Sequence, residues 1–284
     1  MKLANFQADR GQELGLVKGE RLIPVSRLAP GLARDMIDLI ARFEEIERDL
    51  RALERDGTAT LALADVGLLA PVQHPSKIMA IGLNYADHIA EAKAKIPEHQ
   101  LWFSKMPSSI NGPSAPLQIP KAGQAVDYEA ELVAVIGKGG RHIAKADAPK
   151  AIFGYCCGND VTERGWQMRT PQWVLGKSFD THAPIGPWIT TADEVSDVHA
   201  LSIRCLVNGE LRQSSNTRNL VFNVFDQVEH LSKAMTLCPG DLIFTGTPGG
   251  VGAAMQPPRF LRSGDRVRVE IETLGAIEAS CIDE

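Results

Sequence analysis

The sequence lacks any block of clustered lysine or arginine, any apolar run near the length of a membrane span, and any Cys-x-x-C pair. Its 284 residues carry 30 Lys and Arg against 35 Asp and Glu, a formal net charge of −5. Binding nucleic acid needs clustered cations that neutralise phosphates, so we expect no nucleic-acid partner. A membrane-spanning helix needs about 20 consecutive apolar residues, so we expect no membrane partner either.

Cysteine is also scarce. The five cysteines are odd in number, and their spacing favours reduced thiols in an intracellular protein. The first residues, MKLANFQADRGQ, have no apolar core of the signal-peptide kind. Hydrophobic residues make up 44% and charged residues 23%, which is typical of a soluble globular protein. We therefore expect a cytoplasmic location.

The pattern of apolar, polar and turn-forming residues changes near residue 70. Residues 1–70 combine short strand-like pieces with a helix expected over 32–53, where apolar residues recur at spacings of three and four. Residues 71–284 alternate short strands with loops rich in Gly, Pro, Asn and Asp, and we expect helices only near 85–94 and 224–235. The strand candidates are KIMAIG, AELVAVIG, LSIRCLVNG, DLIFTG and DRVRVEIE. The pattern predicts a β-rich α+β protein with a small N-terminal domain (1–70) and a larger domain (71–284).

The segment VDYEAELVAVIG (126–137) alternates like one strand, and it places Asp127, Glu129 and Glu131 on a face that then turns apolar. A carboxylate beside the core is costly unless it is paired or binds a cation. Asp160, at the end of AIFGYCCGND, offers a third carboxylate. Three carboxylates without clustered His or Cys suit Mg²⁺, Mn²⁺ or Ca²⁺. The alternative is a solvated edge strand whose glutamates face water.

Six motifs in one order make the metal interpretation more specific. They are GLNYADHIAEA, VDYEAEL, NDVTERGWQ, LGKSFDTHAPIGP, QSSNTRNLVF and PGDLIFTGTPGGVG. From about residue 75 to the C-terminus, the chain resembles the fumarylacetoacetate hydrolase family. The resemblance implies mixed β-sheets rolled around the site and a homodimer. It also implies Mg²⁺ or Mn²⁺, with Ca²⁺ as a further occupant, bound by Glu129, Glu131 and Asp160.

The resemblance also implies the catalytic groups. His88 and Glu91 are three apart, hence neighbours on a helix, and they match the family's dyad, in which a carboxylate orients an imidazole base. Without the family, such a pair is usually two solvated side chains. Lys177 matches the active-site lysine, whose ammonium would stabilise an enolate. Thr247, in a glycine-rich turn, would bind a substrate carboxylate.

Three further expectations concern neighbouring residues. Arg164 and Gln167 would share one face of a helical turn after Asp160. There the arginine either binds a substrate carboxylate through a bidentate pair of hydrogen bonds or forms a structural ion pair. Asp127 is expected to support the ligands or the fold rather than to bind the metal. Residues 92–103 form either a lid over the site or an ordinary surface loop.

Residues 1–70 are too few for the N-terminal barrel of true fumarylacetoacetases, so the smaller acylpyruvase and 2-hydroxyhepta-2,4-diene-1,7-dioate isomerase-type members are the better match. We expect metal-dependent hydrolysis of a carbon–carbon bond in a 2,4-dioxo (acylpyruvate-like) acid through a metal-bound enolate, in aromatic or sugar acid catabolism. A decarboxylase, an isomerase of a related dienoic acid and a catalytically silent metal-binding member stay open as alternatives. A nucleotide site in TGTPGGVG is excluded because the Gly-Lys-[Ser/Thr] ending is missing.

Overall fold

The computed structural model describes residues 1–9 and 11–284. A mixed sheet forms its centre, with the strand order β4-β3-β2-β1-β14-β12-β11-β17-β6-β7, while β5 pairs with β1 and β8 with β14. These strands are β1 Lys2–Ala8, β2 Gly11–Lys18, β3 Arg21–Pro24, β4 Leu61–Ala62, β5 Gly67–Leu69, β6 Ile78–Gly82, β7 Leu101–Lys105, β8 Ile110–Asn111, β11 Ala130–Ile136, β12 Ile152–Asn159, β14 Ala183–Thr191 and β17 Leu242–Phe244.

A second sheet has the order β16-β15-β18-β19-β9, and β10 pairs with β13 alone. Their bounds are β9 Leu117–Ile119, β10 Val126–Asp127, β13 Thr162–Glu163, β15 Ser202–Val207, β16 Glu210–Asn216, β18 Arg266–Ile271 and β19 Gly275–Asp283. The α-helices of the described residues are α1 Val25–Leu28, α2 Met36–Ala41, α3 Phe43–Asp56, α4 Ala86–Glu91, α5 Ala148–Ala151, α6 Arg164–Gln167 and α7 Val224–Ala234. The expected strand-rich α+β class is confirmed. Within the described ranges, no helix is long and apolar enough to cross a membrane.

The helix expected over 32–53 is two helices, so that prediction was wrong in its continuity. Helix α2 begins only at Met36, where the Asp35 carboxylate caps it by accepting the backbone N–H of Asp38 at 2.8 Å. Arg42, with φ −104° and ψ 13°, separates α2 from α3. The apolar face nevertheless persists, because Leu39 and Leu50 are both fully buried.

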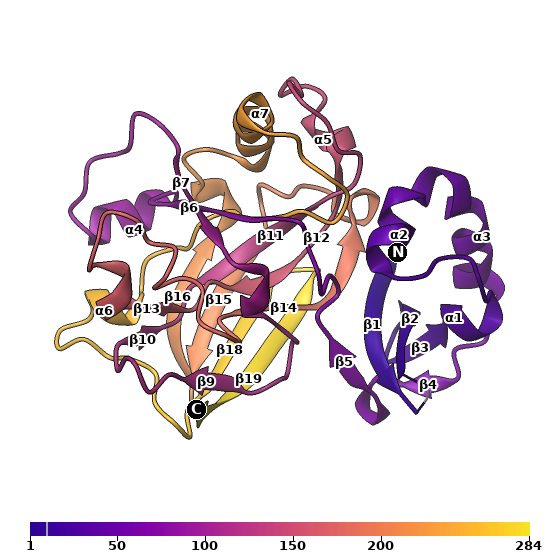
Figure 1. The fold of residues 1–284 in the computed structure, drawn as a ribbon, viewed down its shortest axis with the longest axis horizontal. Coiled ribbons are helices and arrows are strands. Elements are labelled where there is room, and N and C mark those ends of the chain that lie inside the picture. Colours follow the sequence, from indigo (N-terminus) through magenta and orange to yellow (C-terminus); the bar gives the residue numbers. More distant parts are fainter. Residues whose placement is uncertain (10) are drawn as a thin grey trace.

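The N-terminal strands continue the central sheet instead of forming a sheet of their own. Strand β1 pairs with β14, where Lys2 lies opposite Thr190. One hydrophobic cluster contains Leu3 and Leu50 together with Val133 and Val135 of β11. Figure 1 shows this indigo part at one end of the molecule, with α2 and α3 beside β1. The boundary near residue 70 stays a prediction, and sheet and core both run across it.

The segment 126–137 is also interrupted. The structure has two strands, β10 and β11, with Tyr128 and Glu129 between them. The break arises because β10 pairs with β13, whereas β11 enters the central sheet, where Ala130 lies opposite Asn159. The alternation that predicted two faces is preserved: Tyr128 packs in one hydrophobic cluster and Val133 in another.

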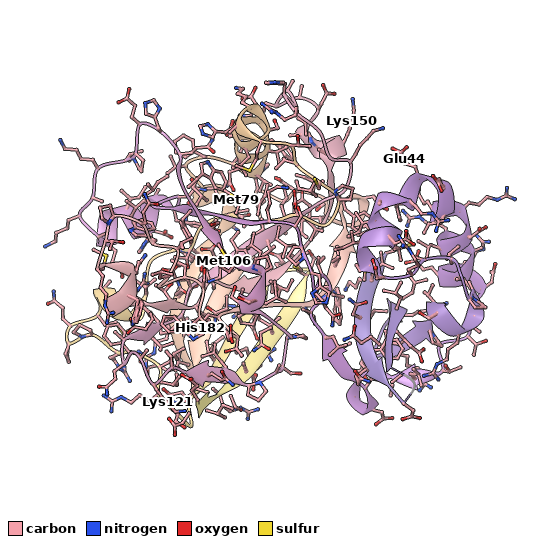
Figure 2. The ribbon with its side chains drawn as sticks, in the orientation of Figure 1. Glu44, Met79, Met106, Lys121, Lys150 and His182 are labelled. Carbon is pink, nitrogen blue, oxygen red and sulfur yellow. The ribbon has the colours of Figure 1, made fainter. Side chains whose placement is uncertain are left out.

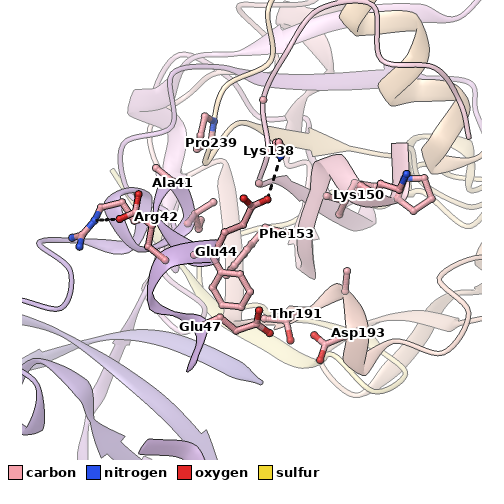
Figure 3. Close-up of a pocket in the computed structure, with 18 of the residues that line it drawn as sticks. Ala41, Arg42, Glu44, Glu47, Lys138, Lys150, Phe153, Thr191, Asp193 and Pro239 are labelled. Atoms are coloured by element: carbon pink, nitrogen blue, oxygen red, sulfur yellow. Dashed lines mark hydrogen bonds and ion pairs between the residues drawn. The ribbon is translucent and has the colours of Figure 1, made fainter. Parts of the chain in front are cut away.

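A pocket lies between the N-terminal helices and the larger part of the chain (Figure 3). Phe43 and Phe153 pack edge to face beside it, with ring centroids 5.0 Å apart. Charged side chains around it pair with one another, as Glu44 does with Lys138 at 3.3 Å. The carboxylate cluster described next does not line this pocket.

Candidate active site

Three buried carboxylates converge where β11 begins and β12 ends. Glu129 directly precedes β11, Glu131 lies within it opposite Gly158, and Asp160 directly follows β12. One oxygen from each lies within 4.8 Å of the others, and the three residues are at most 5% exposed. The antiparallel pairing of the two strands thus brings together the three residues that the sequence singled out as metal ligands.

Two buried lysines contact these carboxylates. Lys177 Nζ donates to Glu129 Oε2 and to Asp160 Oδ2, both at 2.7 Å. Lys105 Nζ donates to Asp160 Oδ1 at 2.7 Å and to the backbone oxygen of Lys177. Burial tends to lower the pKa of both ammonium groups. At Lys177 the attraction of Asp160 and Glu129 outweighs burial, so the pKa of Lys177 is raised. At Lys105 burial outweighs this attraction, so the pKa of Lys105 is lowered. Lys177 is therefore held as a cation against two of the three carboxylates.

Lys105 was missed by the sequence reasoning. It lies at the end of β7, two residues after Phe103, so both side chains belong to the same face of that strand. The Phe103 ring lies 4.9 Å from Lys177 Nζ, and Lys105 is 1% exposed. No local pattern signalled its burial, because Leu101 on the same face of the strand is 39% exposed.

The Arg164 guanidinium forms hydrogen bonds and ion pairs with other side chains of the protein. Its Nε donates to Asp127 at 2.9 Å, its Nη2 lies 2.7 Å from Glu129 Oε1, and its Nη1 donates to the Gln167 side chain at 3.1 Å. Burial would lower the pKa of Arg164, but Glu129 and Asp127 raise it above its ordinary value. Within the described residues, Arg164 Nη2 forms no aligned hydrogen bond, but it lies within ion-pair distance of both Asp127 and Glu129, so the charge of the guanidinium is paired inside the protein. The structure therefore contains the ion-pair alternative, and a substrate contact of Arg164 or of the 6% exposed Gln167 stays a prediction.

The acceptor positions of the Asp127 carboxylate are occupied by hydrogen-bond donors of the protein. It is fully buried and accepts the backbone N–H groups of Tyr128, Gly252 and Ala253 at 2.7–3.0 Å, besides the Arg164 guanidinium. A carboxylate offers about four acceptor positions, and these contacts occupy them. Asp127 thus supports the neighbouring segments, as the sequence predicted.

The charges of the site leave room for a further cation. The buried set contains four carboxylates and three cationic side chains, a formal charge of −1: Asp127, Glu129, Glu131 and Asp160 against Lys105, Arg164 and Lys177. Among the described residues, Glu131 has no cationic side chain within ion-pair distance and accepts the N–H of Gly246 at 2.8 Å. Burial, followed by Asp160 and Glu129, raises the pKa of Glu131 well above its usual range. A divalent ion with a preference for oxygen ligands, such as Mg²⁺ or Mn²⁺, fits this donor set.

The His88–Glu91 pair forms on helix α4, as predicted. His88 Nδ1 lies 3.5 Å from Glu91 Oε2, a loose contact. Both Glu91 oxygens accept the backbone N–H of Gly250 at 3.0 Å. Burial tends to raise the pKa of Glu129, but Lys177 and Arg164 bring it below its usual value.

Thr247 lies beside the carboxylates, and its hydroxyl forms hydrogen bonds within the protein. Thr247 Oγ1 donates to the backbone oxygen of Ala130 and accepts from Gln213 Nε2, both at 2.9 Å. Gln213 also donates to the oxygen of Pro248 at 2.8 Å, which fixes the glycine-rich turn. A substrate contact of Thr247 stays a prediction.

The lid expectation is wrong for part of its range. Leu101 to Phe103 belong to β7, which pairs with β6 through Ile81 and Trp102, so they are not a loop. The irregular part between α4 and β7 is residues 92–100, where Ile96 is 65% exposed. A lid role of that shorter segment stays a prediction.

Comparison with known proteins places the chain in a family. Residues 77–281 match the family described as fumarylacetoacetate (FAA) hydrolase C-terminal, so the chain belongs to the fumarylacetoacetate hydrolase family, as the motifs indicated. It is 42% identical to the oxaloacetate tautomerase fahd2, mitochondrial, of Xenopus laevis, over 98% of this chain and 89% of that protein.

Two solved structures share the whole fold. The maleylpyruvate hydrolase of Sphingobium sp. SYK-6, in complex with manganese(II) ion and pyruvate, is 37% identical with a TM-score of 0.85, and the match covers 100% of this chain and 99% of that one. The 5-carboxymethyl-2-hydroxymuconate delta-isomerase of Mycobacterium smegmatis is 32% identical with a TM-score of 0.80, over 100% and 99% of the two chains. The relatives are thus named as enzymes of three kinds: a tautomerase, a hydrolase and an isomerase.

Proposed function

We propose that this protein is a divalent-metal-dependent enzyme that acts on short 2-oxo acids through their enolates, and that its reaction is keto–enol tautomerisation of an oxaloacetate-like 2-oxo dicarboxylate. The observation that carries this proposal is the buried trio Glu129, Glu131 and Asp160 with the Lys177 ammonium placed across two of its members. The 42% identity to an oxaloacetate tautomerase along 98% of the chain supports the substrate class.

The three carboxylates would bind Mg²⁺ or Mn²⁺, which when bound acts as a Lewis acid on a substrate oxygen. The manganese(II) in the maleylpyruvate hydrolase structure supports this cofactor. A dication would change the formal charge of the buried set from −1 to +1, which suits a substrate carboxylate. The Lys177 ammonium stabilises the negative charge that develops on the 2-oxo oxygen, because a preorganised cation in a site shielded from water acts strongly.

Tautomerisation then needs one group that moves a proton. His88 accepts the proton from C3 of the keto acid, and Glu91 orients the imidazole while it is charged. Returning a proton to the 2-oxo oxygen completes the conversion to the enol, and the reverse steps give the keto form. No bond between carbon atoms breaks in this reaction.

The second candidate is the hydrolysis of an acylpyruvate-like 2,4-dioxo acid, supported by the maleylpyruvate hydrolase with bound pyruvate. Here His88 takes a proton from water, the water oxygen adds to the C4 carbonyl, and the C3–C4 bond breaks to leave a carboxylic acid and the pyruvate enolate. The same enolate would arise in a decarboxylase or an isomerase. We propose small 2-oxo acids as the partners in each case.

One assay separates these reactions. Protein stripped with EDTA and reloaded with Mg²⁺ or Mn²⁺ is given the enol of oxaloacetate and, separately, acetylpyruvate, with ultraviolet absorbance, pyruvate and CO₂ all measured. The proposal predicts metal-dependent loss of enol absorbance without CO₂ or new acid. Pyruvate from acetylpyruvate at a higher kcat/KM would establish the hydrolase instead, and CO₂ from oxaloacetate the decarboxylase.

Location and assembly are part of the same proposal. We infer a homodimer from the family resemblance. The cytoplasmic location stays a prediction from the sequence, while the Xenopus laevis relative bears "mitochondrial" in its name.

A further inference from the structure

The glycine-rich turn after β17 uses its backbone N–H groups on carboxylates. Gly246 donates to Glu131 at 2.8 Å, Gly250 donates to both oxygens of Glu91 at 3.0 Å, and Gly252 donates to Asp127 at 2.7 Å. Glu91 belongs to α4, whereas Asp127 and Glu131 belong to one segment much later in the sequence. The turn therefore joins helix α4, which carries His88, to the strands that carry the carboxylate trio.

Helix α4 has a second attachment, through Asp87. Asp87 Oδ2 accepts the hydroxyl of Ser215 on β16 at 2.5 Å, and Asp87 Oδ1 accepts the backbone N–H of Gly249 at 3.3 Å. Ser215 Oγ in turn accepts the side-chain amide of Asn219 at 3.1 Å. These contacts give a role to Ser215 and Asn219 of the motif QSSNTRNLVF, whose first residue, Gln213, contacts Thr247.

The length of α4 makes such attachments necessary. The helix spans six residues, Ala86–Glu91, and a helix this short is not stable without tertiary contacts. Its Tyr85 N-cap makes no side-chain capping bond, while Ile89 is buried and His88 is partly exposed. The position of the imidazole is therefore set by what the helix is docked against.

We propose that Ser215, through Asp87, and the backbone N–H of Gly250, through Glu91, are positioning groups that dock helix α4 and fix the position of His88. The catalytic part of this inference rests on the function proposed above. Glu91 thus has two partners in the docked state: the Gly250 N–H, and the imidazole 3.5 Å away. A displacement of about 1 Å at a reacting group costs up to about 10²-fold in rate, so undocking lowers kcat without touching the metal ligands.

Gly250 suits this task for a steric reason. Its φ is +99°, and a Cβ there would lie 2.0 Å from the backbone oxygen of Arg212. A side chain at this position would displace the turn and carry the N–H away from Glu91. Gly264 has a similar φ of +90° with open space around it, and therefore provides a control for backbone strain alone.

The simpler alternative is that Asp87 serves only its own helix. It is the acidic residue of the first turn and accepts the N–H of His88 at 2.8 Å, which stabilises a helix start locally. That alternative gives Ser215 no part, so substitution of Ser215 separates the two.

The experiment compares Ser215→Ala with Ser214→Ala, its exposed neighbour on β16, and with Ser215→Thr, which keeps the hydroxyl. Backbone hydrogen exchange of residues 86–92, kcat on the preferred substrate and the Kd for Mn²⁺ are measured for each. Ser215→Ala should exchange about 10-fold faster in α4 and lose about 10-fold in kcat, as expected for a lost hydrogen bond to a charged acceptor. The Kd for Mn²⁺ should stay within about 2-fold, Ser214→Ala should match wild type, and Ser215→Thr should recover most of the loss.

Gly250→Ala should give a larger drop in kcat, about 10²-fold, whereas Gly264→Ala should keep wild-type kcat. Unchanged exchange in α4 of Ser215→Ala overturns the docking, and faster exchange with unchanged kcat overturns the positioning. Wild-type protein that binds no Mn²⁺ and turns over no 2-oxo acid refutes the proposed function instead, and the exchange of α4 still decides whether Ser215 docks the helix.

Discussion

Replacing Lys177 with methionine tests the ion pairs at the centre of the site. The side chain keeps its approximate length but loses the ammonium that donates to Glu129 and Asp160 at 2.7 Å each. Both carboxylates are buried, and removal of one partner from a buried ion pair typically destabilises a protein by about 3–5 kcal/mol. Glu129 keeps Arg164 and Asp160 keeps Lys105, but the formal charge of the buried set changes from −1 to −2. For a chain of this size, the loss corresponds to a fall in Tm of roughly 6–15 °C.

The assay is urea unfolding of Lys177→Met and wild-type protein, first in EDTA and then in saturating Mn²⁺. The deficit of about 3–5 kcal/mol should appear in EDTA and shrink in Mn²⁺, since a dication compensates the same carboxylates. Lys138→Met is the matched control. Lys138 pairs with Glu44 at 3.3 Å, and the two side chains are 72% and 82% exposed, so its loss should be hardly measurable. A Lys177→Met deficit in EDTA no larger than that of Lys138→Met would refute the ion pairs described here.

Three further outcomes follow from the site. His88→Ala should lower kcat by roughly 10²–10⁴-fold with the Kd for Mn²⁺ unchanged, and loss of Mn²⁺ binding would make His88 a ligand rather than a base. Glu131→Gln should abolish Mn²⁺ binding, measured by electron paramagnetic resonance, while the metal-free protein unfolds no more easily than wild type, because Glu131 has no cationic partner among the described residues. Burial lowers the pKa of His182, which lies inside the larger part of the fold (Figure 2), to about 4. Since a histidine in the unfolded chain has a pKa near 6.5, stability present above pH 6.5 should be lost as the pH falls towards 4, by about 3 kcal/mol. His182→Gln should flatten this dependence in urea unfolding at pH 7.0, 5.5 and 4.5, and an equally steep curve would contradict it.

The sequence was most informative where a local pattern matches a tertiary constraint. The alternation in VDYEAELVAVIG separated the face of Glu129 and Glu131 from that of Tyr128, and the two hydrophobic clusters keep that separation. Alternation cannot show where a chain leaves one sheet for another, because side chains continue to alternate through the change. The break between β10 and β11 therefore became visible only in the pairing with β13 and β12.

Partners contributed by distant segments were beyond such patterns. Lys105 reaches Asp160 from a strand 55 positions away, and no local spacing connects them. Arg164 lies beside the site, as expected, but its ion pairs with Asp127 and Glu129 depend on two distant segments of the chain meeting. The continuous helix over 32–53 failed for a different reason: helical spacing tolerates the irregular turn at Arg42, since α2 and α3 both keep their apolar sides inward.

The central claim is that Glu129, Glu131 and Asp160 bind a divalent metal on which turnover of a 2-oxo acid depends. The most direct measurement titrates Mn²⁺ into EDTA-stripped protein and follows bound metal and the conversion of oxaloacetate enol in the same samples. The account predicts one Mn²⁺ per chain, activity that rises in proportion to bound metal, and neither in Asp160→Asn. Full enol conversion in metal-free protein, or unchanged Mn²⁺ binding in Asp160→Asn, would contradict it.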